Sequence, residues 1–283
     1  MNRFKTVILL SLLTGLFMVV GNQIGGQQGM LIGLLMAGVS NFFSYFFSDR
    51  MVLAQYGAKE VTASQQPHLF AIVDRLARSG DMPMPKVYMI DMQAPNAFAT
   101  GRDPAHAAIA VSPSIMKLMT TDELEAVIAH ELGHVKNYDI LISSMAATIA
   151  GALSYLAHIA YYIGPSSRGS DDRGRGGSPL SLLFLVIVTP LIGTLLHLAV
   201  SRQREYGADE YSAHLTRNPR ALASALAKLG GVAAQYPATP EPGQESTAHL
   251  FIINPFDTSF IQSLFSTHPP LAERIARLKE IVI

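Results

Sequence analysis

The most prominent pattern along the chain is a set of four long apolar blocks separated by more polar stretches. They run from Phe4 to Ile24, from Met30 to Phe47, from Ile140 to Ile163 and from Leu180 to Val200. A helix needs about 20 mostly apolar residues to cross a bilayer. Because backbone groups in lipid must find internal hydrogen-bond partners, each block is predicted to be a transmembrane helix.

The first block has an alternative interpretation as a cleaved signal peptide, because Arg3 and Lys5 precede it. A signal peptide ends in a small-x-small cleavage site, and the residues from Val19 to Gln23 form a poor one. A second apolar block also follows closely. These features favour a membrane anchor that stays in the protein.

The polar stretch before the third block carries the patterns of a small folded unit. Pro67 to Ser79 has the amphipathic spacing of a helix that opens with proline. Lys86 to Asp91 and Ala107 to Ser112 are predicted to be short strands on either side of a polar loop. Thr120 and Glu123 have the spacing of a capping box, so a further helix is predicted to begin there.

After the fourth block, helical patterns cover Ser201 to Thr216, Pro219 to Leu229 and Pro270 to Ile283. Gly230 to Ser266 is rich in proline, glycine, threonine and serine, and we expect a long loop there. The predicted fold class is therefore mainly α with a small β-sheet. It combines four transmembrane helices with one catalytic domain whose two halves pack together across an intervening membrane hairpin. The corresponding divisions of the chain are 1–48, 49–139, 140–200 and 201–283.

Basic residues near the ends of the apolar blocks predict the orientation. Arg3 and Lys5 precede the first block, Arg50 and Lys59 follow the second, and the connection from Gly21 to Gly29 carries no charge. Since basic residues are enriched on the cytoplasmic side, the amino terminus and the soluble domain are expected to be cytoplasmic. Three arginines between the third and fourth blocks weaken this rule, because four crossings would place that loop outside.

Composition agrees with a membrane protein. Charged residues make up 15% of the 283 positions, against about 25% in soluble proteins. Twenty-one basic and 21 acidic residues give no net charge, so nothing suggests a nucleic-acid partner. The chain has no cysteine, which excludes disulfides and thiolate ligands. Histidine and carboxylate side chains must therefore hold any transition metal.

The strongest chemical signal is His130-Glu131-Leu132-Gly133-His134, which matches the H-E-x-x-H zinc pattern. Residues four apart lie on one face of a helix, so both imidazoles can reach one metal, with Glu131 beside it. The alternative is a helix with two histidines and a solvated glutamate. Apolar neighbours such as Val127 and Ile128 argue against it, because unpaired polar groups would be costly to bury there.

A catalytic zinc has three protein ligands and one open position. No third histidine follows soon after His134, and Glu205 is the best candidate further along the chain. Asp209 shares its helix face and could accept the free N–H of a liganding imidazole. In the alternative interpretation, both acids form ion pairs with Arg202 and Arg204 on a solvated face. Spacing favours the ligand interpretation without deciding it.

Together these residues resemble the HtpX-type membrane zinc peptidases, a gluzincin-like group related to the prenyl-protein endopeptidases. The resemblance rests on the zinc motif, on Arg204-Glu205 with Asp209, on the run from Asn96 to Gly101, and on Thr267-His268-Pro269-Pro270. The two leading membrane helices and the later hairpin occur in the same order. Nearly the whole chain is covered.

The resemblance implies a zincin-like peptidase domain with one Zn²⁺ per chain, held by His130, His134 and Glu205. Glu131 would be the catalytic base, and Asp209 would support a liganding imidazole. His268 is a candidate oxyanion donor, with a structural role at the start of the following helix as its equal alternative. An extended substrate would pair with a sheet edge formed by Asn96, Ala97, Phe98, Ala99 and Thr100, for which a simple surface turn is the alternative.

The implied activity is zinc-dependent cleavage of damaged or misfolded membrane and membrane-adjacent polypeptides at the inner membrane of a bacterium. A prenyl-protein processing peptidase is a second hypothesis, weakened because those relatives have more membrane helices. A non-catalytic metal-binding adaptor is a third. Zinc binding alone would not need Glu131, so its presence argues against the adaptor. A transporter is disfavoured, because the apolar blocks contain no acidic residue, and their only basic residues are Lys5 at the start of the first block, His158 and His197.

Overall fold

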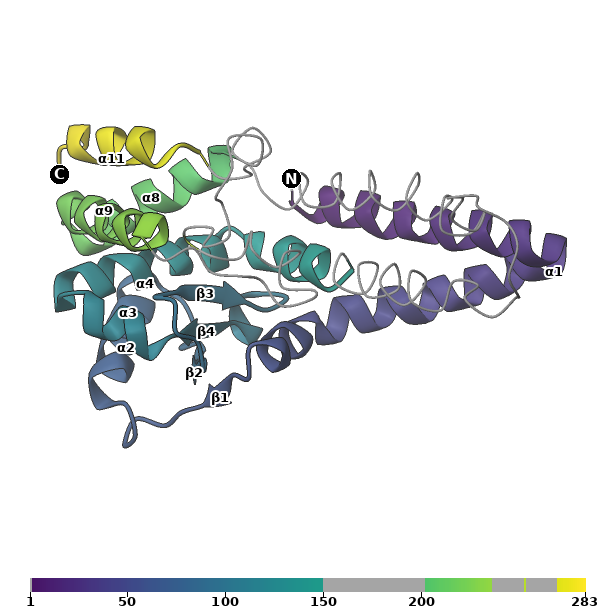
Figure 1. The fold of residues 1–283 in the computed structure, drawn as a ribbon, viewed down its shortest axis with the longest axis horizontal. Helices are drawn as coiled ribbons and strands as arrows, with labels where there is room; N and C mark the ends of the chain where they lie inside the picture. Colours follow the sequence, from purple (N-terminus) through teal and green to yellow (C-terminus); the bar gives the residue numbers. More distant parts are fainter. Residues whose placement is uncertain (1, 150–201, 236–251, 253–268) are drawn as a thin grey trace, which may run out of the picture.

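The computed structural model describes residues 2–149, 202–235, 252 and 269–283 (Figure 1). The fourth apolar block, most of the third, the loop between them and His268 lie outside these residues. Within them the chain is mainly helical with one small sheet. A long helical hairpin extends to one side of a compact α/β unit (Figure 1).

The hairpin is the helix α1, Asn2–Gln55, which is interrupted where Gly25 and Gly26 leave helical geometry. Its stretches Thr6–Gln23 and Gly25–Gln55 are long and apolar enough to cross a membrane. The first two predicted helices are therefore present. The second continues eight residues beyond Phe47, and the chain leaves it at Gly57, whose φ of +56° suits glycine.

The two arms of α1 pack closely. A Cβ atom on Gly33 would collide with the backbone of Phe17 in the opposite arm, so only glycine fits. The Asn41 amide donates to the Thr14 hydroxyl across the same interface at 3.0 Å. Small residues and interhelical hydrogen bonds are what hold helices together in lipid.

The sheet has four strands in the order β1-β2-β4-β3, in which only β2 and β4 are parallel. The two strands expected from the sequence are β2 and β4. The loop between them contains β3, which pairs with β4 alone and so forms an edge among the described strands. The strand bounds are Lys59–Glu60 for β1, Lys86–Met89 for β2, Ala97–Thr100 for β3 and Ala108–Val111 for β4.

Helix α4 is the centre of the soluble unit, in contact with β3 and with three other helices. Its apolar residues Val127, Ile128 and Leu132 are fully buried. The helices around the sheet are α2 Pro67–Ser79, the short 3₁₀ turn η1 Pro104–His106, α3 Pro113–Leu118, α4 Thr121–Lys136, α8 Arg202–Thr216, α9 Pro219–Gln235 and α11 Leu271–Glu280. Helices from both sides of the 140–200 segment thus share one core.

The expected loop from Gly230 is wrong over its first six residues, because α9 continues to Gln235. Gly230 lies directly against the Leu271 side chain, which occupies the space that a Cβ atom would need. At this position glycine allows close packing against Leu271 and does not end α9. The usual association of glycine with the end of a helix therefore gives the wrong boundary here.

A short apolar helix, Asp139–Ile149, begins directly after α4. Tyr138 joins the two with a φ of +58°, a left-handed conformation that turns the chain. Leu141, Ile142 and Met145 of the short helix pack against Leu13 of the hairpin. The start of the third predicted membrane helix therefore lies alongside the first.

Candidate metal centre

The catalytic motif lies in the second half of α4, whose start is fixed by a complete capping box. The Thr120 hydroxyl accepts from the Glu123 amide, and the Glu123 carboxylate accepts from the Thr120 amide at 2.8 Å. Lys228 and Ser224 of α9 bond the same carboxylate at 2.6 Å. The predicted capping box is confirmed, and it also ties α4 to α9.

His130, Glu131 and His134 are brought together by one turn of α4. The two imidazole rings lie 4.8 Å apart and almost perpendicular to each other. His130 and Glu131 are buried, and the His134 side chain is 16% exposed. The alternative in which Glu131 is a solvated side chain is therefore wrong.

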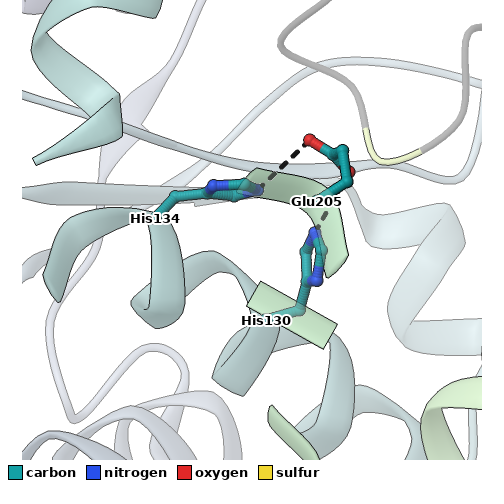
Figure 2. Close-up of side chains that lie close together, drawn as sticks. All are labelled: His130, His134 and Glu205. Atoms are coloured by element: carbon teal, nitrogen blue, oxygen red, sulfur yellow. Dashed lines mark ion pairs between the residues drawn. The ribbon is translucent and has the colours of Figure 1, made fainter. Parts of the chain in front are cut away.

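Glu205 of α8 completes a three-residue cluster, and its carboxylate points at both imidazoles (Figure 2). Its oxygens lie 3.7 Å from His130 Nε2 and 3.5 Å from His134 Nε2. One candidate ligand atom from each residue falls within 4.8 Å of the others. Because the Glu205 side chain is only 7% exposed, its interpretation as a solvated acid on a helix face is also wrong.

Close contact between α4 and α8 sets the position of Glu205. A Cβ atom on Gly133 would lie 3.1 Å from Ala208 Cα and 3.3 Å from Tyr211 Cδ1. The glycine of the H-E-x-x-H motif therefore lets α8 approach α4 with little room to spare. This approach carries Glu205, three residues before Ala208, to the imidazoles.

The donor set fits a divalent transition metal. Zinc bonds of about 2.0–2.2 Å in tetrahedral geometry place neighbouring ligand atoms roughly 3.3 Å apart, close to the 3.5 and 3.7 Å separations found here. Both histidines direct Nδ1 toward an aspartate, which leaves Nε2 of each imidazole facing Glu205. This is the arrangement that fixes the tautomer of metal-binding histidines.

Asp209, the expected partner of a liganding imidazole, lies beside His130. His130 Nδ1 lies 3.0 Å from an Asp209 oxygen. Arg274 of α11 donates two hydrogen bonds to the Asp209 carboxylate, from Nη2 at 2.6 Å and from Nε at 2.8 Å. Burial alone would raise the pKa of Asp209, but the Arg274 guanidinium lowers it below its usual range.

Arg274 also approaches the metal-binding atoms. Its side chain is 1% exposed, and Nη1 lies 3.3 Å from a Glu205 oxygen. Nη2 lies 3.4 Å from His130 Nε2. Burial, helped by the nearby guanidinium, lowers the pKa of His130 and keeps the imidazole neutral, the form that binds metals.

His134 has its own carboxylate. Its Nδ1 lies 3.1 Å from Asp139 Oδ2, and Asp139 Oδ1 lies 3.5 Å from Arg204 Nη1. Burial opposes a charge on His134, yet its hydrogen bond to Asp139 and the carboxylate of Glu205 raise its pKa to about 9.

Glu131 faces the edge strand. Its carboxylate accepts a hydrogen bond from the backbone N–H of Ala99 in β3 at 2.9 Å. Burial, together with the negative charge of Glu205, raises the pKa of Glu131 to about 7. A carboxylate with a pKa near neutrality is suited to both accept and return a proton.

The sequence analysis did not identify Arg274, nor Asp139 as a partner of His134. It considered Arg204 only as an ion-pair partner of Glu205 or Asp209 on a solvated helix face. Asp139 follows His134 by five residues, a spacing that misses the face of an uninterrupted helix. Only the left-handed turn at Tyr138 brings it back. Arg274 lies in an amphipathic helix, where an arginine normally faces solvent.

Comparison with known proteins decides the family. The sequence profile of peptidase family M48 matches residues 63–282, more than half of the chain. The chain belongs to peptidase family M48. It is therefore a metallopeptidase, and the cluster on α4 and α8 lies inside the matched region.

Relatives within this group match along their whole length. A protease HtpX homolog from Sulfurihydrogenibium sp. is 49% identical over 286 residues, which cover 99% of this chain and 96% of the relative. Another from Thermodesulfovibrio yellowstonii is 50% identical over 279 residues, covering 99% and 98%. The resemblance to HtpX-type peptidases is thus confirmed.

Among solved structures, the crystal structure of Ste24p from S. mikatae has a similar fold. Its TM-score is 0.54 at 18% sequence identity, and the match covers 98% of this chain and 65% of that chain. At this identity the likeness is evidence for the fold alone. This M48 chain spans about two thirds of the length of that structure.

Proposed function

We propose that the protein is a zinc endopeptidase of the bacterial inner membrane, with His130, His134 and Glu205 as metal ligands. The observation that carries this proposal is the convergence of the three side chains from two helices that are far apart in the sequence. The donor set contains two imidazole nitrogens, a carboxylate and no sulfur, and it suits one Zn²⁺ per chain. When bound, zinc supplies a Lewis acid that polarises a peptide carbonyl and makes water more acidic.

Glu131 is proposed to move the proton. Its carboxylate takes a proton from the attacking water and returns it to the nitrogen of the departing amine. A pKa of about 7 lets the same group do both near neutral pH. Asp209 and Asp139 hold the two imidazoles in position while this happens.

The substrate is proposed to bind as an added strand along β3. Strand β3 is hydrogen-bonded to β4 along one side. The backbone N–H and C=O groups of Ala97 and Ala99 lie on the opposite side and point away from β4. Ala99 donates to Glu131, so a peptide paired there would lie beside the catalytic base. The Asn96 side chain is buried, with no hydrogen-bond partner among the described residues, and is available to a substrate backbone. Pairing through the backbone predicts broad specificity.

Four membrane crossings are proposed, two by the α1 hairpin and two within 140–200. The packing of Asp139–Ile149 against α1 supports the third crossing. The guanidinium groups of Arg50 and Arg102 lie over the rings of Phe47 and Phe46, and this pairing of basic and aromatic side chains supports a lipid boundary at this end of the hairpin. The soluble halves 49–139 and 201–283 then form one cytoplasmic catalytic domain.

The proposed substrates are membrane and membrane-adjacent polypeptides, above all misfolded ones. Both halves of the metal centre adjoin segments that enter the membrane, so the site lies near the bilayer surface. This role in quality control is part of the proposal and rests on the resemblance to the HtpX-type peptidases, since the relatives are named only as protease HtpX homologs. His268 remains a proposed donor to the developing oxyanion.

Substitution of Glu131 tests the proposal. Wild type and Glu131→Gln are purified in detergent, and zinc content and cleavage of an unfolded protein are measured. We expect about one zinc per chain in both proteins, and a fall in cleavage of at least about 10²-fold in the variant, because only proton transfer is lost. Equal cleavage would rule out the proposed base. Wild type that binds zinc but cleaves nothing would favour an adaptor.

A further inference from the structure

Asp139 lies between a metal-binding histidine and an arginine. One of its oxygens, Oδ2, is 3.1 Å from His134 Nδ1, and the other, Oδ1, is 3.5 Å from Arg204 Nη1. The side chains of Asp139 and Arg204 are 4% and 11% exposed. The buried Asp139 carboxylate thus has the His134 imidazole beside one oxygen and the Arg204 guanidinium near the other.

The pair also joins two distant points of the chain. Asp139 is the first residue of the helix Asp139–Ile149, and Arg204 lies in the first turn of α8. Between them in the sequence lies the segment 140–200, the proposed membrane hairpin. The left-handed Tyr138 returns the chain toward His134 at the point where it leaves α4. Such a conformation is unfavourable in a residue with a side chain, so the surrounding packing and contacts must hold it.

We propose that Asp139 is a positioning residue for the metal centre and that Arg204 holds it in place, so that the two ends of the 140–200 segment are tied together at His134. The inference rests on the zinc site proposed above. By accepting the Nδ1–H of His134, Asp139 keeps the Nε2 lone pair directed at the metal and makes it a stronger donor. Arg204 offsets the buried charge of Asp139 and selects the oxygen that faces the imidazole.

Asp209 does not duplicate this role. It lies 3.0 Å from His130 Nδ1, and Arg274 occupies both of its oxygens. Each imidazole therefore has its own carboxylate and its own arginine. Loss of Asp139 leaves His134 unsupported.

The test measures zinc affinity of the full chain in detergent by competition with a chelator of known affinity. The variants are Asp139→Asn, Arg204→Gln and the double variant. Asp139→Asn is expected to weaken zinc binding by about 10–100-fold, the usual effect of losing such a partner. Arg204→Gln is expected to weaken it less. The double variant should stay within about threefold of Asp139→Asn, because Arg204 acts through Asp139.

Controls separate a positioning role from a merely structural one. Arg75 forms an exposed ion pair with Glu125 at 2.7 Å, and Arg75→Gln should bind zinc like wild type. Arg204→Lys keeps the charge and should restore most of the affinity lost in Arg204→Gln. The visible absorption spectrum of the cobalt-loaded protein should shift in Asp139→Asn, since the His134 ligand changes, but not in Arg75→Gln. Cleavage should recover at saturating zinc, with KM for a peptide unchanged.

Thermal unfolding of the metal-free proteins checks that each variant is folded, and if Asp139→Asn is not, the two Arg204 variants carry the test. Zinc affinities within twofold of wild type in Asp139→Asn and Arg204→Gln would overturn the inference. The double variant could also bind zinc more weakly than Asp139→Asn by the full factor measured for Arg204→Gln alone. That result would show that Arg204 does not act through Asp139. Wild type that binds no zinc would instead reject the proposed function.

Discussion

At the residue scale, a proton and a metal ion compete for the same nitrogen of His134. Burial opposes protonation, but the hydrogen bond to Asp139 and the charge of Glu205 raise the pKa of His134 to about 9. Below that pH the metal-free protein holds a proton that zinc must displace. The environment that attracts a metal cation therefore also attracts hydrogen ions.

We predict that zinc binding releases about one proton at pH 7 and becomes weaker as the pH falls below 9. The sign follows from the raised pKa, because each unit of acidity increases the competition at His134 by about tenfold. Calorimetric titration in two buffers with different ionisation enthalpies measures the released proton. A binding enthalpy that is the same in both buffers at pH 7 would contradict the prediction.

The candidate ligands and one neighbouring carboxylate, Asp209, could be predicted, but Asp139 and Arg274 could not. The H-E-x-x-H spacing identifies His130, Glu131 and His134. The four-residue interval of a shared helix face suggests Glu205 and Asp209. Arg274 and Asp139 have no such interval. Their positions depend on how α11 packs on α8 and on one left-handed residue, and neither is visible as a local pattern.

At the scale of elements, the contact between α4 and α8 controls the geometry of the metal centre. Gly133 faces the backbone of Ala208, and a Cβ atom there would lie 3.1 Å from Ala208 Cα, closer than most such contacts. Gly207, on α8 itself, has open space where a Cβ atom would lie. The two glycines therefore form a matched pair for substitution.

We predict that Gly133→Leu separates the helices and lowers zinc affinity by at least about tenfold, with a loss of stability of about 1–3 kcal/mol from overpacking. Gly207→Leu should keep the affinity of wild type, since nothing lies within 4 Å of the new Cβ atom. Chelator competition and thermal unfolding measure the two effects. Equal zinc affinity in the two variants would show that this contact does not position Glu205.

Helices whose own sequence marks their ends, for example by a proline start or a capping box, could be predicted well. The helix α2 has the bounds expected from its proline start and apolar spacing, and the capping box gave the start of α4. Strand β3 is different, because Ala97–Thr100 is too short to show alternation, and only the resemblance led us to expect a sheet edge there. Its pairing with β4 makes it a strand, so the alternative of a surface turn is wrong. Tertiary contact similarly extends α9 through Gly230, against the usual preference of glycine.

At the scale of the whole molecule, sequence patterns indicated that residues on both sides of 140–200 build one domain. The shared core of α4, α8 and α9 agrees with that expectation. The orientation in the membrane stays a prediction. The chain offers a convenient test, because it contains no cysteine and a single introduced thiol can be labelled without background.

We predict that Gln27→Cys, at the turn of the hairpin, reacts with an impermeant maleimide in right-side-out vesicles. Ser64→Cys, before α2, should react only in inverted vesicles, because the soluble domain is expected on the cytoplasmic side. Both positions are exposed, so accessibility within the protein does not limit labelling. The reverse labelling pattern would contradict the orientation derived from Arg50 and Lys59.

The division of the metal centre between α4 and α8 has a consequence for the newborn chain. A ribosome making this protein completes His130, Glu131 and His134 well before Glu205, and Arg274 later still. Until residue 205 has been synthesised, the nascent polypeptide has two imidazoles and a base but lacks the third donor. The proposed zinc site therefore cannot be completed until the later part of the chain, beyond residue 205, has been synthesised.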